Sequence, residues 1–536
     1  MKIIFFSPLG WSLIVGNPHL AIPLLKSHVA SKGHAIKAYD LNLGIAKFYD
    51  LNVDISNVQS FSLDSLNDPY FSVEDTLSSV ASKFDGEWNL QLGFNSLRYS
   101  SASSQQVIEA SRMELPFTSY YKSVVLPLVS KEKPGIVAFS IASASQLIPT
   151  FHLCWLLRQY GYDGKIVVGG NVISRLKNEV KIDGLFDLID VFVFFQGEIS
   201  FALLCDAISQ NKELHDIPNI IFRDNYNRII ETENITFRNP NIFPTPDFDG
   251  LPVGQYFGIN YLPLIASRGC YHNACNFCSI PFGWGEGGYG GMRSSELIYK
   301  DMSSLKKKHG NYRFKFMDES LNPSLMSALS KIILQSHDYY EWEGYARLEK
   351  IWQNNTFTSL ISKAGFKKVY FGLEIYPDAS RTLLNKDDYA VRIIDILRNC
   401  YDSGIKVHLF CMFGFPGTGR KEAEETIEFI LANIELIDTI DINGFSYSKH
   451  TFIPSLKKIE HPLNDWSLEY DYVPLEKDAL KPEEIKDLVS DLEEVIWRQH
   501  PKLLHPTYRL LSPWDDAAKF MNQKTTQKEY LFANIF

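Results

Sequence analysis

Three cysteines crowd one short stretch of the chain. The segment CYHNACNFC at 270–278 places Cys270, Cys275 and Cys278 within nine residues, and the other four cysteines are scattered. Thiolates are good ligands for soft transition metals, so a metal centre explains the crowding. A structural zinc site takes four protein ligands, and the sequence has only this one cluster. His272 is the candidate fourth ligand, but four ligands so close in sequence form an awkward site.

An iron–sulfur cluster matches three thiols better. A [4Fe–4S] cluster usually takes four thiolates. Three thiolates leave one iron open, and an open iron can bind a substrate or cofactor. A loop that holds three corners of the cluster therefore presents the fourth corner to another molecule. A chance group of thiols in a loop is the competing interpretation.

Alternating strands and helices from about residue 263 must position these cysteines. Six β/α units form most of a barrel that stays open on one side, with its active face at the carboxyl ends of the strands. The cysteines follow the first of these strands and so belong to that face. The predicted strands are LPLIASRG (262–269), FKFMDES (314–320), YEWEGYAR (340–347), KVYFGLEI (368–375), KVHLFCMFGF (406–415) and TIDINGFSY (439–447).

The first third of the chain alternates in the same way, in strands such as KIIFFSP and GIVAFSIA. Apolar strands separated by single helices predict an α/β fold with a Rossmann-like parallel sheet. Ligands of such sheets bind outside the carboxyl ends of the strands. Those ends carry small or polar residues here, among them Ser7, Ser140, Gly169 and Gly197, which suit close approach by a ligand.

The chain therefore divides into four predicted parts. Residues 1–236 form the Rossmann-like domain, with a partly helical insertion near 44–115 that is rich in Ser, Asn and Asp. Residues 237–262 form a linker, because four prolines between 237 and 252 prevent a regular element. Residues 263–454 form the partial barrel, and 455–536 form a mostly helical C-terminal substrate or cap domain.

Composition narrows the classes of function. The 536 residues carry a net charge of −10, and no run of Lys and Arg supplies a footprint for nucleic acid. The longest apolar stretch, 136–157, contains Gln146, Pro149 and His152, so no membrane span is expected. The N-terminal run reads as a strand and not as a secretion signal. Seven cysteines give no regular disulfide framework, which favours a reducing cytoplasm.

The motifs of the barrel region resemble the radical SAM superfamily over about 263–450. That family usually has three residues between its first two cysteines, whereas this chain has four. Phe277 before the last cysteine is as expected. The other matching segments follow in order: FMDES with Asp318 and Glu319, GYARLEK with Arg347, AGFKKVYFGLEI with Glu374, and GIKVHLFCMFGFPGTGRKEAEETIEFI with Gly414.

The resemblance implies that Cys270, Cys275 and Cys278 hold a [4Fe–4S] cluster whose open iron binds S-adenosylmethionine (SAM). An electron, from a donor such as flavodoxin or ferredoxin, then cleaves SAM to a 5′-deoxyadenosyl radical that abstracts hydrogen from a small-molecule or peptide substrate. The implied SAM contacts are Phe277, Glu319, Arg347, Glu374 and Gly414.

Each implied SAM contact has a structural alternative. Glu374 can be an ordinary salt-bridge partner, Arg347 can anchor Asp318 or Glu319, and Gly414 can belong to a turn. The glycine run GWGEGGYGG at 283–291 is interpreted as a flap over the cluster or as a plain flexible loop.

Residues 1–215 resemble the cobalamin-binding domain that often precedes radical SAM barrels. The resemblance implies cobalamin contacts at the strand ends, and methyl transfer to an unactivated carbon as the chemistry. An Asp-x-His-x-x-Gly segment, which supplies a cobalt ligand in many cobalamin proteins, is absent from the sequence. The implied contacts are Ser140, Ser143, Gln146, Gly169, Gly170 and Gly197.

Several alternatives stay open at this point. The front domain can be a Rossmann-like fold that binds nothing. The enzyme can catalyse a radical rearrangement, oxidation or cyclisation without methyl transfer. A different class is a non-catalytic iron–sulfur or cobalamin-sensing protein, against which the set of barrel motifs argues.

Overall fold

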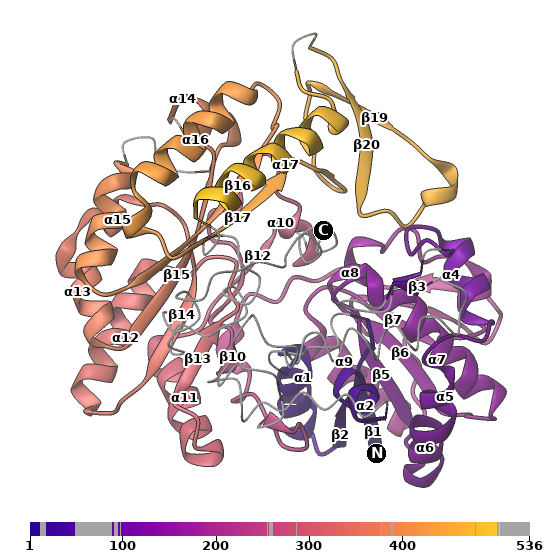
Figure 1. The fold of residues 1–536 in the computed structure, drawn as a ribbon. Helices are drawn as coiled ribbons and strands as arrows, with labels where there is room; N and C mark the ends of the chain where they lie inside the picture. Colours follow the sequence, from indigo (N-terminus) through magenta and orange to yellow (C-terminus); the bar gives the residue numbers. More distant parts are fainter. Residues whose placement is uncertain are drawn as a thin grey trace.

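The computed structural model shows two α/β lobes side by side (Figure 1). The first lobe contains a seven-stranded sheet and the second a six-stranded sheet. The structure describes residues 1–10, 18–48, 88–89, 95–96, 98–253, 256, 261–285, 287–376, 378–386, 391–476, 479–500 and 503. Most of the predicted insertion near 44–115 and the end of the chain lie outside these residues.

The first sheet is parallel except at one edge. Its strands run in the order β2 (Ala35–Asp40), β1 (Lys2–Ser7), β5 (Ile136–Ser140), β6 (Lys165–Gly169) and β7 (Val191–Val193), followed by the antiparallel hairpin β8 (Ile220–Arg223) and β9 (Ile229–Glu231). Counting only the parallel strands, this is the doubly wound order 2-1-3-4-5. The order reverses between β1 and β5, which is where such sheets bind their ligands. The predicted Rossmann-like sheet is confirmed.

Helices cover both faces of this sheet because successive residues of its strands face opposite ways. Ile3 and Phe5 of β1 pack with one side of the lobe, whereas Ile4 and Phe6 pack with the other. The helices on the first side are α1 (Ala21–Ala30) and α9 (Gly197–Ser209). Those on the second side are α4 (Ser104–Ser111), α6 (Leu126–Glu132) and α7 (Leu147–Gln159). Shorter helices are α2 (Leu41–Phe48), α5 (Thr118–Tyr120) and α8 (Asn171–Arg175), and β3 (Trp88–Asn89) pairs with β4 (Asn95–Ser96).

The second sheet is fully parallel and confirms the predicted partial (β/α)6 barrel. Its order is β10 (Leu262–Leu264), β13 (Arg313–Phe316), β14 (Glu341–Ala346), β15 (Phe366–Glu374), β16 (Lys406–Phe413) and β17 (Thr439–Gly444). The helices between its strands are α11 (Ser295–His309), α12 (Pro323–Ser336), α13 (Asn355–Lys363), α14 (Asp378–Arg381), α15 (Ile393–Asp402) and α16 (Arg420–Ala432).

Local signals set the ends of the barrel helices. The hydroxyl of Ser294 accepts a hydrogen bond from the backbone N–H of Leu297 and so caps the start of α11. The same helix ends at Gly310, which has the left-handed conformation that a C-terminal glycine allows. Asn322 caps α12 in the same way as Ser294, and Pro323 follows it in the first turn.

The C-terminal region connects the two lobes. Strands β18 (Tyr447–Ser448), β20 (Glu469–Pro474) and β19 (Leu456–Ile459) form a small antiparallel sheet, and α17 (Pro482–Gln499) follows. The indole of Trp466 is buried in the core of the first lobe, against Phe151. The sequence predicts a mostly helical region from residue 455; α17 agrees with this prediction, and the small sheet was not predicted.

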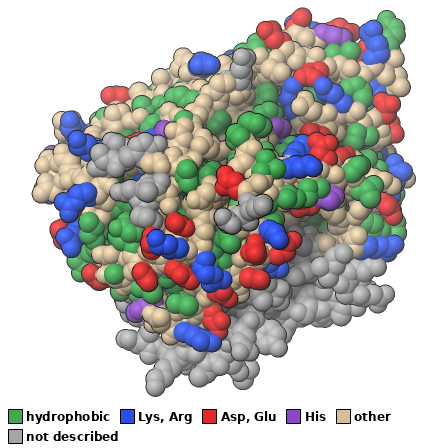
Figure 2. All heavy atoms as spheres, turned by 90° about the horizontal axis from the view of Figure 1, so that it is seen from above, with side chains coloured by type: hydrophobic (Ala, Val, Ile, Leu, Met, Phe, Trp, Pro, Cys, Tyr) green, Lys and Arg blue, Asp and Glu red, His purple; other side chains and the backbone are tan. Residues whose placement is uncertain are grey.

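Charges of both signs are interspersed on the described part of the face shown in Figure 2. Within the described part of the chain, no helix is both long enough and apolar enough to span a bilayer.

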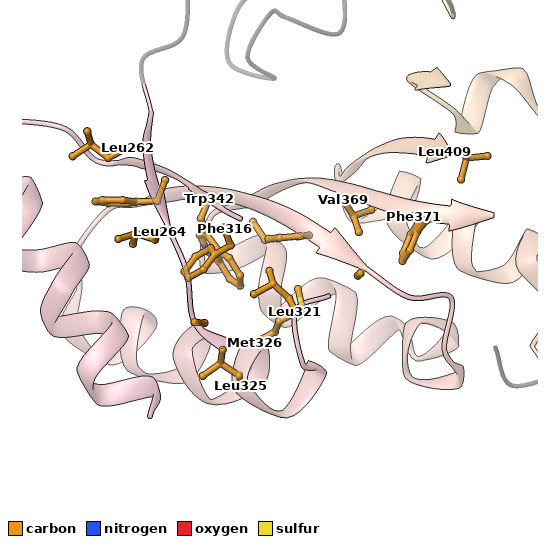
Figure 3. Close-up of a cluster of buried hydrophobic side chains, with 14 of the residues drawn as sticks. Leu262, Leu264, Phe316, Leu321, Leu325, Met326, Trp342, Val369, Phe371 and Leu409 are labelled. Carbon is orange, nitrogen blue, oxygen red and sulfur yellow. The ribbon is translucent and has the colours of Figure 1, made fainter. Parts of the chain in front are cut away.

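The two faces of the barrel sheet differ in character. The outer face carries apolar side chains that pack on the surrounding helices, including Phe316, Trp342 and Phe371 (Figure 3). Alternate residues point the other way, so the inner face receives Lys315, Glu343, Tyr370 and their neighbours. The barrel thus has a conventional apolar outer layer and a polar interior.

Candidate active site

The cysteine loop leaves the short strand β11 (Ser267–Gly269) and ends at α10 (Ile280–Gly283). The segment 383–385 fixes this loop through four hydrogen bonds. The backbone and side-chain N–H groups of Asn276 donate to the carbonyls of Leu384 and Leu383, at 3.0 and 2.8 Å. The side chain of Asn385 donates to the carbonyl of Ala274 at 2.8 Å. His272 Nε2 lies 2.7 Å from the Asn385 carbonyl and donates to it, so His272 does not join the thiols.

Cys270, Cys275 and Cys278 are half-buried free thiols close enough to influence one another. The pKa of Cys275 is raised to about 12 and that of Cys278 to about 11; burial is the largest cause in both, and the nearby Cys270 also contributes. Among the described residues, no three metal-binding side chains surround a single ion position. Three thiols spread around a loop without a fourth ligand are a donor set that fits three corners of a [4Fe–4S] cluster.

An ion pair lies beside this loop. Lys386 Nζ contacts Glu374 Oε1 and sits 5.9 Å from the ring centre of Phe277. Its positive charge lowers the pKa values of Cys275 and Cys278 against the effect of burial. Glu374 has a φ of +61° where the pairing register of β15 shifts, and a Cβ at Gly372 would collide with Lys386 Nζ. The backbone is therefore shaped around this pair. Glu374 and Phe277 were predicted site residues, whereas Lys386 was not predicted from the sequence.

Arg347 is held by two neighbours. Its Nε and Nη2 donate to the Lys386 carbonyl, and Nη1 donates to Glu349 Oε1 at 2.7 Å. The alternative in which Arg347 anchors Asp318 or Glu319 is not what the structure shows.

Asp318 and Glu319 both follow strand β13, but Asp318 is hydrogen bonded within the fold whereas Glu319 lines a cavity. Asp318 is buried and accepts hydrogen bonds from the Ala266 N–H at 2.8 Å and the Ser267 hydroxyl at 2.6 Å, which ties β13 to the start of the cysteine loop. Glu319 is open to a cavity, and Trp284 Nε1 donates to it at 3.4 Å. The surrounding protein still removes most of its bulk water, and this desolvation raises its pKa to about 7.

Two glycine features have packing explanations. Gly414 has a φ of +82°, and a Cβ there would collide with Ile485 of α17. The glycine run at 283–291 includes strand β12 (Tyr289–Met292), which pairs with β11. A Cβ at Gly290 would meet Gln196 of the first lobe and would lie 2.9 Å from Arg268 Cβ. The run therefore lets the two lobes approach closely, and its strand pairing differs from the plain loop or flap that was expected.

One cavity of about 600 Å³ lies between the lobes. The first lobe lines it with strand ends, including Ser140, Gly169, Gly170 and Gly197, and with Gln146. Ser143 is not among the lining residues; its hydroxyl lies 2.9 Å from that of Ser145. The second lobe contributes the residues Tyr261, Pro263, Ile265, Arg268, Ile280, Gly283, Trp284, Lys315, Met317, Glu319, Glu343 and Tyr370.

Several predicted front-lobe residues shape the protein itself. Gln146 accepts from the Ala142 N–H at 2.8 Å and donates to the Pro8 carbonyl at 3.0 Å, so its amide holds the loops at the switch point together. A Cβ at Gly170 would collide with the backbone of Ile141, and one at Gly169 would lie 2.9 Å from the Val193 carbonyl. These glycines are required by the backbone, whether or not a ligand approaches them.

Two further residues of the cavity were missed from the sequence. Gln196 is 3% exposed, and neither its Oε1 nor its Nε2 has a hydrogen-bond partner within the described part of the chain. Arg268 pairs with Glu198 at 2.6 Å across the lobes, with both side chains buried. The glycine run was the only available signal for the lobe contact, because these partners lie some 70 residues apart.

Comparison with known proteins identifies one region of the chain. Residues 264–430 match the model of the Radical SAM superfamily. This region is a radical SAM domain. It begins at β10 and includes the three cysteines, Glu319, Arg347, Glu374 and Gly414.

Named relatives of the chain are distant. The uncharacterized methyltransferase PH0819 of Pyrococcus horikoshii is 26% identical over 332 residues, which are 60% of this chain and 69% of that protein. Bacteriochlorophyllide d C-12(1)-methyltransferase of Chlorobaculum tepidum is 22% identical over 230 residues, which are 40% of this chain and 46% of that protein. The chain thus spans less than half the length of the second relative.

Solved structures extend the likeness to both lobes. The radical SAM methyltransferase TsrM from Kitasatospora setae, with cobalamin and a [4Fe–4S] cluster bound, has a TM-score of 0.57 at 13% identity and covers 90% of this chain and 84% of its own. The cobalamin-dependent S-adenosylmethionine radical enzyme OxsB, with aqua-cobalamin and SAM bound, has a TM-score of 0.56 at 13% identity. The match covers 95% of this chain and 58% of the OxsB chain. The chain described here shares their fold.

Proposed function

We propose that this chain is a cobalamin-dependent radical SAM methyltransferase that methylates an unactivated carbon of a natural-product or peptide substrate. The observation that carries the proposal is the shared cavity. The strand ends of the front lobe and the mouth of the radical SAM barrel line the same space of about 600 Å³. The reactive parts of two cofactors and one substrate can meet there, as methyl transfer requires.

The thiols of Cys270, Cys275 and Cys278 hold the cluster in this proposal. Bound cluster and SAM supply a 5′-deoxyadenosyl radical, which removes hydrogen from a carbon. Thiols with raised pKa values bind metal only after losing a proton, so binding of the cluster releases protons from the loop. Lys386 supports the thiolates, since it influences Cys275 more strongly than Arg347 does. The reaction also requires an electron donor of the flavodoxin or ferredoxin class to reduce the cluster.

The front lobe fits cobalamin through its polar wall. When bound, cobalamin supplies the methyl group. Its corrin ring carries amide side chains that both donate and accept hydrogen bonds. Gln196 offers a buried donor and acceptor without partners beside the cavity, which matches such a group. The hydroxyl of Ser140 lines the same wall, at the switch point of the sheet.

A non-methylating reaction is the second candidate. Another distant relative, 25% identical over 227 residues, is named anaerobic magnesium-protoporphyrin IX monomethyl ester cyclase, from Synechocystis. A cyclase consumes SAM only as a radical source, whereas a methyltransferase of the proposed type also uses it as a methyl donor. The two therefore differ in their by-products.

The test measures both by-products. The chain is reconstituted anaerobically with iron, sulfide and cobalamin, then incubated with SAM and a strong reductant. We expect S-adenosylhomocysteine, up to the amount of bound cobalamin, together with 5′-deoxyadenosine. Omitting cobalamin should abolish the first product and leave the second. Formation of 5′-deoxyadenosine without any S-adenosylhomocysteine, in protein shown to retain cobalamin, would overturn methyl transfer in favour of the second candidate.

A further inference from the structure

The interior of the barrel contains charged side chains where barrels normally contain bulky apolar ones. Lys315 of β13 lies directly opposite Glu343 of β14 in the strand register, and Tyr345 lies opposite Tyr370. Glu343 is only 1% exposed. Ionisable groups this deep are unfavourable unless paired, so their arrangement calls for a physical explanation.

Glu343 is only half satisfied. Its Oε1 accepts a hydrogen bond from the Tyr370 hydroxyl at 3.0 Å and lies 3.5 Å from Lys315 Nζ. Its other oxygen, Oε2, is buried and has no hydrogen-bond partner among the residues that the structure describes. A buried carboxylate oxygen without a donor loses its hydration and gains nothing in return. A donor from a bound molecule would remove this deficit.

Lys315 has donors to spare as well. An ammonium group carries three N–H donors. Among the described residues Lys315 has a single carboxylate contact, and at 3.5 Å this is longer than a good charge-assisted hydrogen bond. Three aromatic rings surround the Nζ atom instead, with centres at 4.2 Å for Tyr370, 5.5 Å for Tyr345 and 5.7 Å for Tyr261. The ring faces stabilise the cation and do not use up its hydrogen-bond donors.

Both groups border the cavity between the lobes. Tyr261, Lys315, Glu343 and Tyr370 line one part of its wall, and the front-lobe strand ends line another. A volume of about 600 Å³ is in the range of small-molecule sites. A molecule that reaches the barrel interior therefore meets one unused acceptor and one cation with unused donors, held at a fixed spacing.

We propose that Lys315 and Glu343 anchor the substrate of the reaction proposed above through an uncharged amide: a carboxamide, a lactam or a peptide bond. The amide N–H donates to Glu343 Oε2, and the amide carbonyl accepts from Lys315 Nζ. The two side chains carry opposite charges, so a neutral group that both donates and accepts satisfies them together. A carboxylate would face Glu343, and an ammonium would face Lys315, each at a like-charge penalty.

Three ring compounds of similar size test this inference: benzamide, benzoate and benzylamine. Their binding to the full chain, reconstituted with cluster and cobalamin, is measured by ligand-observed NMR titration. We expect benzamide to bind at least tenfold more tightly than either ion. Equal binding of all three, or preference for an ion, overturns the proposal.

Variants that remove one of the two charges should change which of the three compounds binds most tightly. Glu343→Gln removes the negative charge, keeps the shape, and should shift preference at least tenfold toward benzoate. Lys315→Met should shift it toward benzylamine. Should Lys315→Met fail to fold, the near-isosteric Glu343→Gln carries the test alone. An unchanged ranking in folded Glu343→Gln contradicts the assignment.

Glu341→Gln is the matched control. Glu341 lies on the same strand and the same face, pairs with Arg313 at 3.0 Å, and does not line the cavity. This variant should keep the wild-type ranking. The titration measures binding without turnover, whereas S-adenosylhomocysteine formation is measured without substrate, so the amide proposal and the methyl-transfer proposal can fail separately.

Discussion

Burial separates two kinds of cysteine in this protein. Cys400 and Cys411 lie in the apolar core, where a thiol is a small hydrophobic side chain. Cys270, Cys275 and Cys278 lie half-exposed on a loop that hydrogen bonds hold to a second loop. The loop, and not the reactivity of any one thiol, defines the candidate cluster site.

Replacing one thiol of the loop should therefore abolish the cluster. After anaerobic reconstitution, the wild type should contain about four irons and four acid-labile sulfides per chain. We expect Cys275→Ala to contain much less of both. Cys400→Ala is the matched control, since it also removes a buried thiol but leaves only a small core cavity, at about 1 kcal/mol. Iron and sulfide analysis compares the two. A full complement of iron in Cys275→Ala would contradict the ligand assignment.

Glu319 should make stability depend on pH. Its pKa is raised from 4.5 to about 7 by desolvation, so the folded chain binds this proton more tightly than the unfolded chain does. The resulting stabilisation is complete below pH 4.5 and disappears as pH rises to about 7. Unfolding by urea across this window, before reconstitution, should show a steeper decline for wild type than for Glu319→Gln. Identical slopes would show that Glu319 titrates normally.

At the scale of elements, the strand β12 forms the seam between the lobes. It pairs with β11, whose Arg268 forms the buried ion pair with Glu198 of α9. Glycines at this strand allow the backbone to approach side chains of the other lobe. The cysteine loop begins one residue after β11, so the seam also positions the candidate cluster site.

A methyl group at the seam should destabilise the fold. In Gly290→Ala the new Cβ would meet Gln196, and it would lie 2.9 Å from Arg268 Cβ and 3.0 Å from the Phe237 carbonyl. We expect the free energy of unfolding to fall by about 1–3 kcal/mol. Gly184→Ala, where a Cβ meets nothing within 4 Å, should change it by less than about 0.5 kcal/mol. Similar values for both variants would contradict a tight seam.

At the scale of the whole molecule, the sequence predicts the sheets well because their signals are local. Apolar runs such as KIIFFS became β1, and the cysteines follow a predicted strand within a few residues. The partners of the site were not predictable in this way. Lys386 reaches Glu374 from a different loop, Gln196 meets Gly290 across the lobes, and Lys315 meets Glu343 only through strand register. Such pairs depend on tertiary packing, which periodicity does not encode.

The ion pair between the lobes provides a whole-molecule test. Arg268→Met leaves Glu198 buried without its partner and should lower the free energy of unfolding by about 3 kcal/mol. The double variant Arg268→Met, Glu198→Gln should recover about 2 kcal/mol of this loss, because no charge is then left alone. Urea unfolding of the wild type, the two single variants Arg268→Met and Glu198→Gln, and the double variant measures the coupling free energy between the two side chains. Strictly additive losses would show that the pair does not join the lobes.

The central claim is that three thiols hold a cluster whose remaining corner splits SAM. The most direct measurement is 5′-deoxyadenosine formation by the anaerobically reconstituted chain, given SAM and a strong reductant and followed by mass spectrometry. We expect this product from the wild type and from Cys400→Ala, and none from Cys275→Ala. A wild-type protein that carries its iron and sulfide but yields no 5′-deoxyadenosine, or a Cys275→Ala protein that yields as much, would contradict it.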